Sequence, residues 1–353
     1  MNELTITLAQ ALLQRDKGAL LVDARSPAEF AEATIPGALN VPIFADDERA
    51  EIGTLYKQVG KDEARRRAVE LVAPKIPRLL EEVRTAWAGH TGPVIVFCWR
   101  GGMRSKALTS FLDLAGIPAR QLLGGHKAFR RLVLDFFDSG KWGRMLVLRG
   151  LTGVGKTRIL QRLEEENYPV IDLEALANHR GSTFGNLGLP PQPGQKMFEA
   201  LVWDVLRKIG LDDYILAEGE SRHIGRVALP ARLYQALQPE PSLWVTASLE
   251  RRADIILDDY PDPDRFREGF VRQLNALRDR LGGESVGQML GLLEQGAWRE
   301  LVTELMVRYY DPLYRHTLPA NRIEINFDDE EGALVELKTA IAELLTTPKR
   351  PVP

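Results

Sequence analysis

The sequence predicts an α/β protein of two domains, the second of which has a helical C-terminal part. Three observations support this fold class. Through about residue 135, short apolar runs rich in β-branched residues alternate with helical patterns, which is typical of a largely parallel sheet. A second strand-like run, at 145–148, leads into a glycine-rich turn and another helical pattern. A chain of 353 residues that is 44% hydrophobic can also bury more than one core.

The core strands of the first domain are predicted at 20–22 and 94–97. The segment 46–88 between them is long and charged, with helical periodicity at 65–72 and 76–87. Three consecutive arginines in the first of these helices favour a solvated helix face. Contact with an RNA backbone is the alternative for this basic run.

The first domain closes with the Gly-Gly-His-Lys sequence at 124–127. We expect His126 to be structural or next to the substrate rather than a metal ligand, because no partner ligand lies at a useful spacing. Residues 138–143 have linker composition. We therefore expect the first domain at 1–139 and the second at 140–353.

Cys98 is the only cysteine, so the chain can form neither an internal disulfide nor a cysteine cluster for a metal. It lies between an apolar strand and a Gly-Gly turn that leads into a helical pattern. The helix N-terminus and the charges of Arg100 and Arg104 favour a thiolate, which predicts a reactive, catalytic cysteine. The alternative is a structural thiol at the end of a core strand.

The spacing Cys98-x5-Arg104 is compatible with two chemistries. One is hydrolysis of a phosphate ester through a phosphocysteine. The other is transfer of sulfur or selenium as a persulfide or perselenide on Cys98. Both need a loop that holds an anion, so the spacing alone leaves the choice open.

Residues 150–157 match the P-loop pattern Gly-x4-Gly-Lys-Thr, with a strand before it and a helix after it. The glycines let backbone N–H groups surround a diphosphate, Lys156 supplies positive charge, and Thr157 can hold Mg²⁺ in the Mg-nucleotide form of the motif. The predicted diphosphate-binding residues are Gly150, Gly153, Val154, Gly155, Lys156 and Thr157.

Two further predicted strands end in carboxylates, at the edge of an open α/β sheet where ligands bind. Glu218 is the best candidate for the acidic position that accompanies a P-loop, and polar loops follow both strands. The supporting acidic and basic site residues are Asp172, Glu174, His179, Arg180, Glu218, Glu220 and Arg222. The remainder, 253–345, is mostly helical in pattern and is expected to pack on the P-loop domain, with tRNA contact as the weaker alternative.

Charge and hydropathy narrow the functional class. The net charge of −3 argues against indiscriminate nucleic-acid binding but allows a specific RNA partner. No apolar run approaches 18 residues, and the N-terminus lacks a signal-peptide pattern. We expect a cytoplasmic protein with no membrane association and no protein-held metal site.

Several motifs resemble known families. The runs at 21–30 and 35–42, with the Cys98 loop, resemble the rhodanese (sulfurtransferase) domain, although Thr34 stands where such domains often have histidine. Fusion of this domain to a P-loop domain resembles the tRNA 2-selenouridine synthase family, and the likeness covers nearly the whole chain. The sequences that carry it are at 52–60, 171–182, 220–227 and 309–314.

This resemblance implies a transferase that replaces sulfur by selenium at C2 of wobble 2-thiouridine (position 34) in the anticodon stem-loops of Lys, Glu and Gln tRNAs. It implies an S-geranylated intermediate made from geranyl diphosphate, and selenophosphate as the selenium donor, with no tightly bound cofactor. An enzyme that produces selenophosphate is a candidate partner. Cys98 could take the selenium as a perselenide or steer it to C2.

Two other functional classes stay open from the residues alone. One is a P-loop small-molecule kinase with an appended sulfurtransferase domain. The other is a non-enzymatic module that binds phosphoanions or RNA and whose Cys98 is inert. The polar, arginine-containing loops after both carboxylate strands favour the tRNA-modifying enzyme over the kinase, and the Cys98 loop argues against the inert module.

Overall fold

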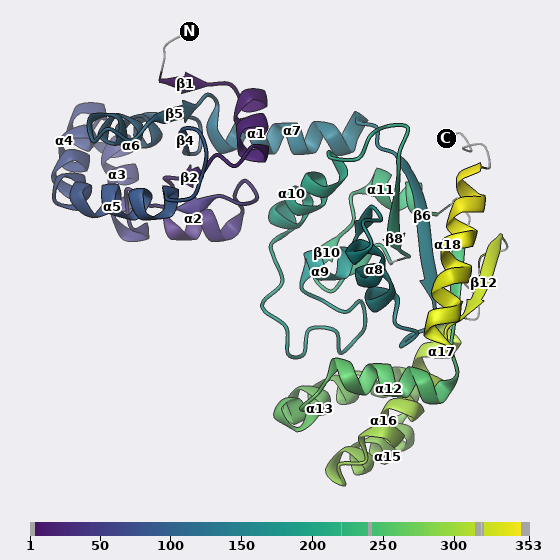
Figure 1. The fold of residues 1–353 in the computed structure, drawn as a ribbon. Coiled ribbons are helices and arrows are strands. Elements are labelled where there is room, and N and C mark those ends of the chain that lie inside the picture. Colours follow the sequence, from purple (N-terminus) through teal and green to yellow (C-terminus); the bar gives the residue numbers. More distant parts are fainter. Residues whose placement is uncertain (1–3, 220, 239–241, 315–318, 320, 347–353) are drawn as a thin grey trace. The chain divides into compact units, whose positions relative to one another are not determined.

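The computed structural model describes residues 4–219, 221–238, 242–314, 319 and 321–346. The chain divides into two compact units, one comprising Met1–Ser139 with Glu199–Leu201 and the other Gly140–Phe198 with Val202–Pro353. Each unit contains its own five-stranded parallel sheet with helices around it (Figure 1). The predicted α/β fold class is confirmed.

The first unit has the strand order β1-β5-β4-β2-β3, with every pair parallel. All four residues of the central strand β4 are buried, as expected for a short apolar run with neighbours on both sides. The predicted core strands correspond to β2 and β4. The strands are β1 (Thr5–Ile6), β2 (Leu21–Asp23), β3 (Leu39–Asn40), β4 (Val94–Phe97) and β5 (Ala119–Leu122).

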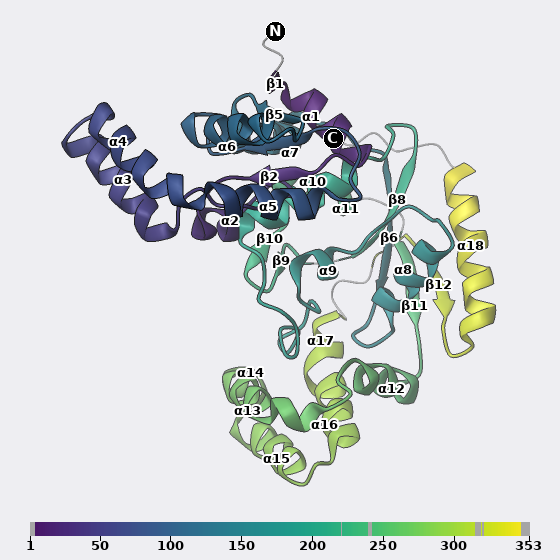
Figure 2. The same ribbon diagram turned by 60° about the vertical axis from the view of Figure 1, so that its left-hand side comes forward.

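The long charged segment of the first unit folds into helices, and α3 and α4 lie side by side as an antiparallel pair (Figure 2). Each of the three consecutive arginines on α4 pairs with an acidic side chain, among them Arg65 with Asp62 and Arg67 with Glu51, which fits a solvated helix face. The helices are α1 (Leu8–Asp16), α2 (Pro27–Glu32), α3 (Asp46–Gln58), α4 (Lys61–Val72), η1 (Ala73–Lys75), α5 (Ile76–Trp87), α6 (Met103–Leu114) and α7 (Gly125–Ser139).

A buried ion pair fixes the chain after β2. Arg25 and Asp23 are both almost fully buried, and Arg25 Nη2 lies 2.6 Å from Asp23 Oδ2. The hydroxyl of Thr34 donates to the same carboxylate oxygen at 2.8 Å. Thr34 therefore has a clear structural role at the position where the resemblance led us to note a departure.

The second unit has the strand order β12-β11-β6-β8-β7, again all parallel, and a small antiparallel hairpin of β9 and β10. The P-loop strand β6 is central. The strands are β6 (Arg144–Gly150), β7 (Val170–Ile171), β8 (Tyr214–Glu218), β9 (His223–Ile224), β10 (Val227–Ala228), β11 (Ser242–Thr246) and β12 (Arg322–Asn326).

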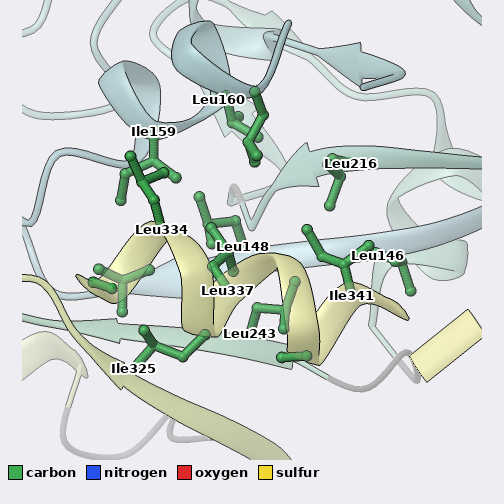
Figure 3. Close-up of a cluster of buried hydrophobic side chains, with 14 of the residues drawn as sticks. Leu146, Leu148, Ile159, Leu160, Leu216, Leu243, Ile325, Leu334, Leu337 and Ile341 are labelled. Atoms are coloured by element: carbon green, nitrogen blue, oxygen red, sulfur yellow. The ribbon is translucent and has the colours of Figure 1, made fainter. Parts of the chain in front are cut away.

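The core of this sheet is formed with α8 and the last helix, α18. Leu146 and Leu148 of β6 lie under Leu337 and Ile341 of α18, and Leu160 of α8 joins the same cluster (Figure 3). The helices before the C-terminal region are α8 (Lys156–Glu165), α9 (Leu173–Ala177), α10 (Gln195–Leu206) and α11 (Ala231–Leu237). Among the helices that the structure describes, none combines the length and apolar character needed to cross a membrane.

The helical C-terminal part contains a hydrophobic cluster of its own, around Phe270, Met289 and Leu301. Its last helix before β12 is interrupted by a π-helical segment, η3, between α16 and α17. The elements are α12 (Leu249–Asp259), η2 (Pro263–Phe266), α13 (Arg267–Ala276), α14 (Arg278–Leu281), α15 (Gly283–Glu294), α16 (Trp298–Leu305), η3 (Met306–Tyr310), α17 (Asp311–Tyr314) and α18 (Glu330–Thr346).

Candidate functional site

Cys98 lies at the junction between β4 and α6. Its thiol is buried, with Sγ 3.2 Å from the backbone N of Gly102 and 3.2 Å from Ser105 Oγ. Gly102 immediately precedes the first residue of α6, so the sulfur faces the N-terminal end of that helix. Unpaired N–H groups and the helix dipole at this position suit an anion. The predicted strand–loop–helix setting of the cysteine is present.

The Gly124-Gly125 turn supports the Cys98 loop from below. Gly125 has φ +55°, and a Cβ at this position would lie 2.1 Å from the carbonyl oxygen of Cys98. The N–H of His126 donates to that oxygen at 2.9 Å. The His126 ring is buried, with Trp99 and Phe129 as ring neighbours at 5.6 and 6.0 Å. The packing role predicted for His126 fits this environment.

Gln121 also holds the loop, and sequence reasoning missed it. Its Nε2 donates to the carbonyls of Gly101 and Gly102 and lies 3.0 Å from Ser105 Oγ. A single side chain from β5 therefore fixes both glycines and the hydroxyl next to the sulfur. Nothing in the local pattern of β5 indicates this role, because the contact spans about 20 residues of sequence.

The two arginines near Cys98 differ. Arg100 is exposed, whereas Arg104 is half-buried and pairs with the carboxylate of Glu29. Burial alone raises the pKa of Glu29, but the hydrogen bond and charge of Arg104, with smaller effects from Ser26 and Arg49, hold it below its ordinary value. The charge of Arg104 is therefore directed at Glu29, and Arg100 is the loop cation open to an incoming anion.

The P-loop lies between β6 and α8. Gly153 and Gly155 have φ near +84°, which an L side chain adopts only with strain, and α8 begins at Lys156. Gly153, Gly155, Lys156 and Thr157 line a cavity of about 550 Å³. Gly150 and Val154 lie behind it: a Cβ on Gly150 would be 2.5 Å from the Val245 carbonyl oxygen, and Val154 is buried in the sheet core.

Three predicted carboxylates meet next to the P-loop. Glu218 accepts a hydrogen bond from the backbone N of Glu174 at 2.6 Å, and Glu174 accepts one from Thr157 Oγ1 at 3.2 Å. Asp172 caps α9 by accepting from the N–H of Ala175. Burial raises the pKa of Asp172. Within the described residues no group of three histidine, cysteine or acidic side chains is placed to hold a metal ion.

The loop after α9 forms another wall of the cavity. The Arg180 guanidinium lies 4.6 Å from the centre of the Tyr260 ring and donates to the carbonyls of Leu187 and Asp259. Burial, with the neighbouring charge of Arg180, lowers the pKa of His179, which favours its neutral form. Both residues line the same cavity as Lys156.

The far side of this cavity is apolar, and most of it comes from the helical C-terminal part. Phe184 and Leu189, two hydrophobic residues near the P-loop, line it, whereas Leu151 and Val154 pack with the sheet core. The helical region was expected only to pack on the P-loop domain. Its apolar contributions are Ile255, Ile256, Leu257, Tyr260, Pro263, Phe270, Trp298, Val302, Leu305, Met306 and Tyr310.

The remaining predicted site residues lie around the β9–β10 hairpin. Arg222 is exposed just before β9. Gln192 holds the hairpin by donating to Ile224 O and accepting from Arg226 N. A Cβ on Gly225 would lie 2.7 Å from the His179 ring, so the hairpin touches the cavity wall. Glu220 lies outside the described residues.

Comparison with known proteins covers both units. Residues 143–343 match the family described as tRNA 2-selenouridine synthase AAA domain, and residues 5–132 match the rhodanese-like domain. A tRNA 2-selenouridine synthase of Pseudomonas fluorescens is 34% identical over 90% of this chain and 93% of its own length. A Nitrosomonas europaea protein of the same name is 31% identical, with the same coverage.

Solved structures give a narrower comparison. The N-terminal domain of an ATP/GTP binding protein from Clostridium difficile 630 is 34% identical. It covers 37% of this chain and 98% of that one, with a TM-score of 0.35.

Proposed function

The chain belongs to the tRNA 2-selenouridine synthase family, and from this premise we propose that it converts 2-thiouridine in tRNA to 2-selenouridine through an S-geranylated intermediate. The enzyme acts on tRNA. The proposal adds geranyl diphosphate as the alkyl donor and selenophosphate as the selenium donor. It also adds the wobble position of Lys, Glu and Gln tRNAs as the target and the cytoplasm as the place of action.

One observation carries the proposal: a diphosphate cradle and an apolar slot share one cavity. Lys156 and Thr157 lie on the P-loop side, and Tyr260, Phe270 and Trp298 lie on the other. A prenyl diphosphate has the same division into an anionic head and a hydrocarbon tail. The cavity of about 550 Å³ is within the range of small-molecule sites.

In the first step the sulfur on C2 of the uridine attacks C1 of geranyl diphosphate. A C–S bond forms, the C–O bond breaks, diphosphate leaves with the electron pair, and N3 of the base loses its proton. Lys156 and the P-loop N–H groups stabilise the charge that develops on the leaving diphosphate. Alkylation matters because a thioether sulfur leaves C2 more readily than the sulfur of a thiocarbonyl.

Mg²⁺ would add charge to the same leaving group. Thr157 Oγ1 and the Glu174 carboxylate, 3.2 Å apart, provide the hydroxyl and carboxylate oxygens that this ion prefers together with water and phosphate. We place Mg²⁺ beside these two residues as part of the proposal.

In the second step selenium attacks C2 and the C2–S bond breaks. The prenyl thiolate leaves, takes a proton and becomes the prenyl thiol. Water then cleaves the Se–P bond to give inorganic phosphate and 2-selenouridine, and N3 regains its proton. We assign this step to the Cys98 loop, where Arg100 and the N-terminus of α6 can hold the phosphoryl group of selenophosphate.

The role of Cys98 that balances is proton transfer. Forming a perselenide on Cys98 from selenophosphate would require phosphorus to be reduced or an oxidant to be supplied, and the proposal contains neither. The Cys98 thiol instead protonates the leaving prenyl thiolate and regains its proton from hydroselenophosphate. Ser105 Oγ and the Gly102 N–H, each 3.2 Å from Sγ, orient the sulfur.

The test is a reconstituted reaction. The full-length protein is incubated with an anticodon stem-loop that carries 2-thiouridine, with geranyl diphosphate and with selenophosphate, and the nucleosides are followed by mass spectrometry. We expect S-geranyl-2-thiouridine to appear first and 2-selenouridine to follow. Selenouridine formed without geranyl diphosphate would overturn the intermediate. RNA-stimulated ATP hydrolysis with no modified nucleoside would favour the kinase alternative.

A further inference from the structure

The helical pair α3–α4 leaves apolar side chains uncovered. None of the 13 residues of α3 is fully buried, and only Ala64 and Val72 of α4 are. Tyr56 on α3 keeps 53% of its surface exposed and Val69 on α4 keeps 67%. Two packed helices normally bury their apolar faces, so this surface indicates a binding site.

The uncovered side chains line a cavity of about 1140 Å³ within the first unit. This volume is at the upper end of the range for small-molecule sites, so an extended ligand fits it. The floor comes from the loop after β3, from α3 and α4, and from α6. Its large apolar residues are Ile43, Phe44, Ile52, Tyr56, Val69, Val72, Ile76, Met103 and Phe111.

The groove reaches the Cys98 loop. Met103 and Arg104, the first two residues of α6, line it, and they follow Gly102, whose N–H donates to Cys98 Sγ. Met103 is 63% exposed. An apolar ligand in the groove would therefore end next to the sulfur that we assign to the selenium step.

The lining of the groove includes cations. Lys57 and Lys61 are exposed, and within the described part of the chain neither takes part in an ion pair or hydrogen bond. Arg49 and Arg65 also line the groove, but each lies within ion-pairing distance of a carboxylate. Free lysines beside an apolar floor suit a ligand whose hydrocarbon chain is attached to a polyanion.

We propose that this groove binds the prenyl chain of the S-prenylated uridine during the selenium step, so that C2 is held at Cys98. This inference rests on the proposed function and names a second prenyl site, distinct from the slot beside the P-loop. The occupant follows from the chemistry: after the first step the prenyl chain is on the tRNA base, and it must accompany C2 to Cys98. The lysines then contact RNA phosphates next to the modified base.

The test uses an RNA stem-loop that is S-geranylated chemically, so it does not depend on the first step. Val69→Asp places a charge in the groove at a site exposed enough to preserve folding. Val335→Asp is the matched control, because Val335 of α18 is 64% exposed and lies in the other unit. Tyr56→Ala is a second groove variant that adds no charge.

We expect the wild-type protein to bind the S-geranylated stem-loop more tightly than the S-methylated one. Val69→Asp should remove this preference and reduce selenation of the geranylated RNA by about tenfold or more at subsaturating RNA, because several methylenes lose an apolar site. Tyr56→Ala should act in the same direction, and Val335→Asp should match the wild type. Far-UV circular dichroism checks folding.

Two outcomes would overturn the groove assignment. One is an unchanged preference for the geranyl group in both groove variants, which would leave the surface to a protein partner. The other is an equal effect of Val335→Asp. Failure of the proposed function is a different result, namely no geranylation of 2-thiouridine RNA by the wild-type protein. That result leaves the binding comparison with prepared RNA intact.

Discussion

Arg252 and Asp311 form a two-pronged ion pair beside the P-loop, with Nη1 3.0 Å from Oδ2 and Nη2 2.5 Å from Oδ1. Arg252 is 3% exposed, and its Nε donates to the carbonyl oxygen of Thr152 at 2.8 Å. The pair therefore ties the backbone of the P-loop to the helix that follows the π-helical segment.

Replacing Asp311 by alanine should destabilise the second unit and weaken ligand binding at the P-loop. The change leaves the Arg252 guanidinium buried without its carboxylate, which costs about 3 kcal/mol of unfolding free energy. Urea unfolding measures the loss, and titration with geranyl diphosphate measures the affinity. Arg162→Ala, which removes an exposed pair with Glu331, should change stability by at most about 1 kcal/mol. Equal effects of the two substitutions would contradict the linking role.

Replacing Cys98 by serine should abolish 2-selenouridine formation while S-geranylation continues. The hydroxyl is a much weaker acid than the thiol, so proton transfer to the leaving thiolate should slow by on the order of 10²-fold or more. Both products are quantified by nucleoside mass spectrometry in one reaction. Equal loss of both products in a folded variant would sink the division of the two steps between the two units.

Replacing Lys156 by alanine should impair geranylation by on the order of 10²-fold or more, because the charge on the leaving diphosphate loses its cationic partner. Lys338→Ala is the control, since Lys338 pairs with Glu166 at the surface, and it should keep wild-type geranylation. The initial rate of S-geranyl-2-thiouridine formation is the measurement. Near-normal geranylation in Lys156→Ala would refute a P-loop role in this step.

Geranyl diphosphate should bind the P-loop cavity more tightly than ATP, and ATP turnover should not be part of the cycle. The apolar wall that includes Phe270 and Trp298 offers more to a hydrocarbon chain than to a γ-phosphate. Calorimetric titration of both ligands into one preparation compares the affinities, with RNA-dependent ATP hydrolysis followed in parallel. Tighter ATP binding together with RNA-stimulated hydrolysis would reverse the assignment.

Replacing Gly125 by alanine should reduce selenation by about 10²-fold while Gly283→Ala has little effect. The new Cβ would lie 2.1 Å from the Cys98 carbonyl oxygen at a positive φ, so the Cys98 loop must move, and small displacements of a reacting group are costly. Gly283 has nothing within 4 Å of its Cβ position. Rates on S-geranylated RNA provide the comparison. Wild-type selenation in Gly125→Ala would show that the close approach has no functional weight.

Much of the fold could be predicted because its signals are local. The apolar run of β4, the Gly-Gly turn after Cys98 and the P-loop spacing each fix a strand end and a helix start within about ten residues. The α/β fold class and the family were predicted from these patterns and are confirmed. The assignment of catalytic and diphosphate-binding residues stays a prediction.

The contacts that sequence reasoning missed are long-range. Gln121 reaches Gly101 across 20 residues, and Arg252 reaches Thr152 across 100. A period of 2 or 3.6 describes which face a side chain occupies but says nothing about its partner in another element. The same limit applies to Arg104, whose nearness in sequence to Cys98 suggested a shared role, whereas its side chain pairs with Glu29.

The π-helical segment Met306–Tyr310 makes this part of the chain sensitive to deletion rather than to substitution. A π turn accommodates one more residue than an α turn, so removing one residue there would restore a regular helix and rotate everything after it by about 100°. Asp311, the first residue beyond the segment, would then turn away from Arg252. Single-residue deletions across 306–310 should thus be tolerated worse than alanine replacements at most of the same positions, and natural variants should conserve the length of this segment.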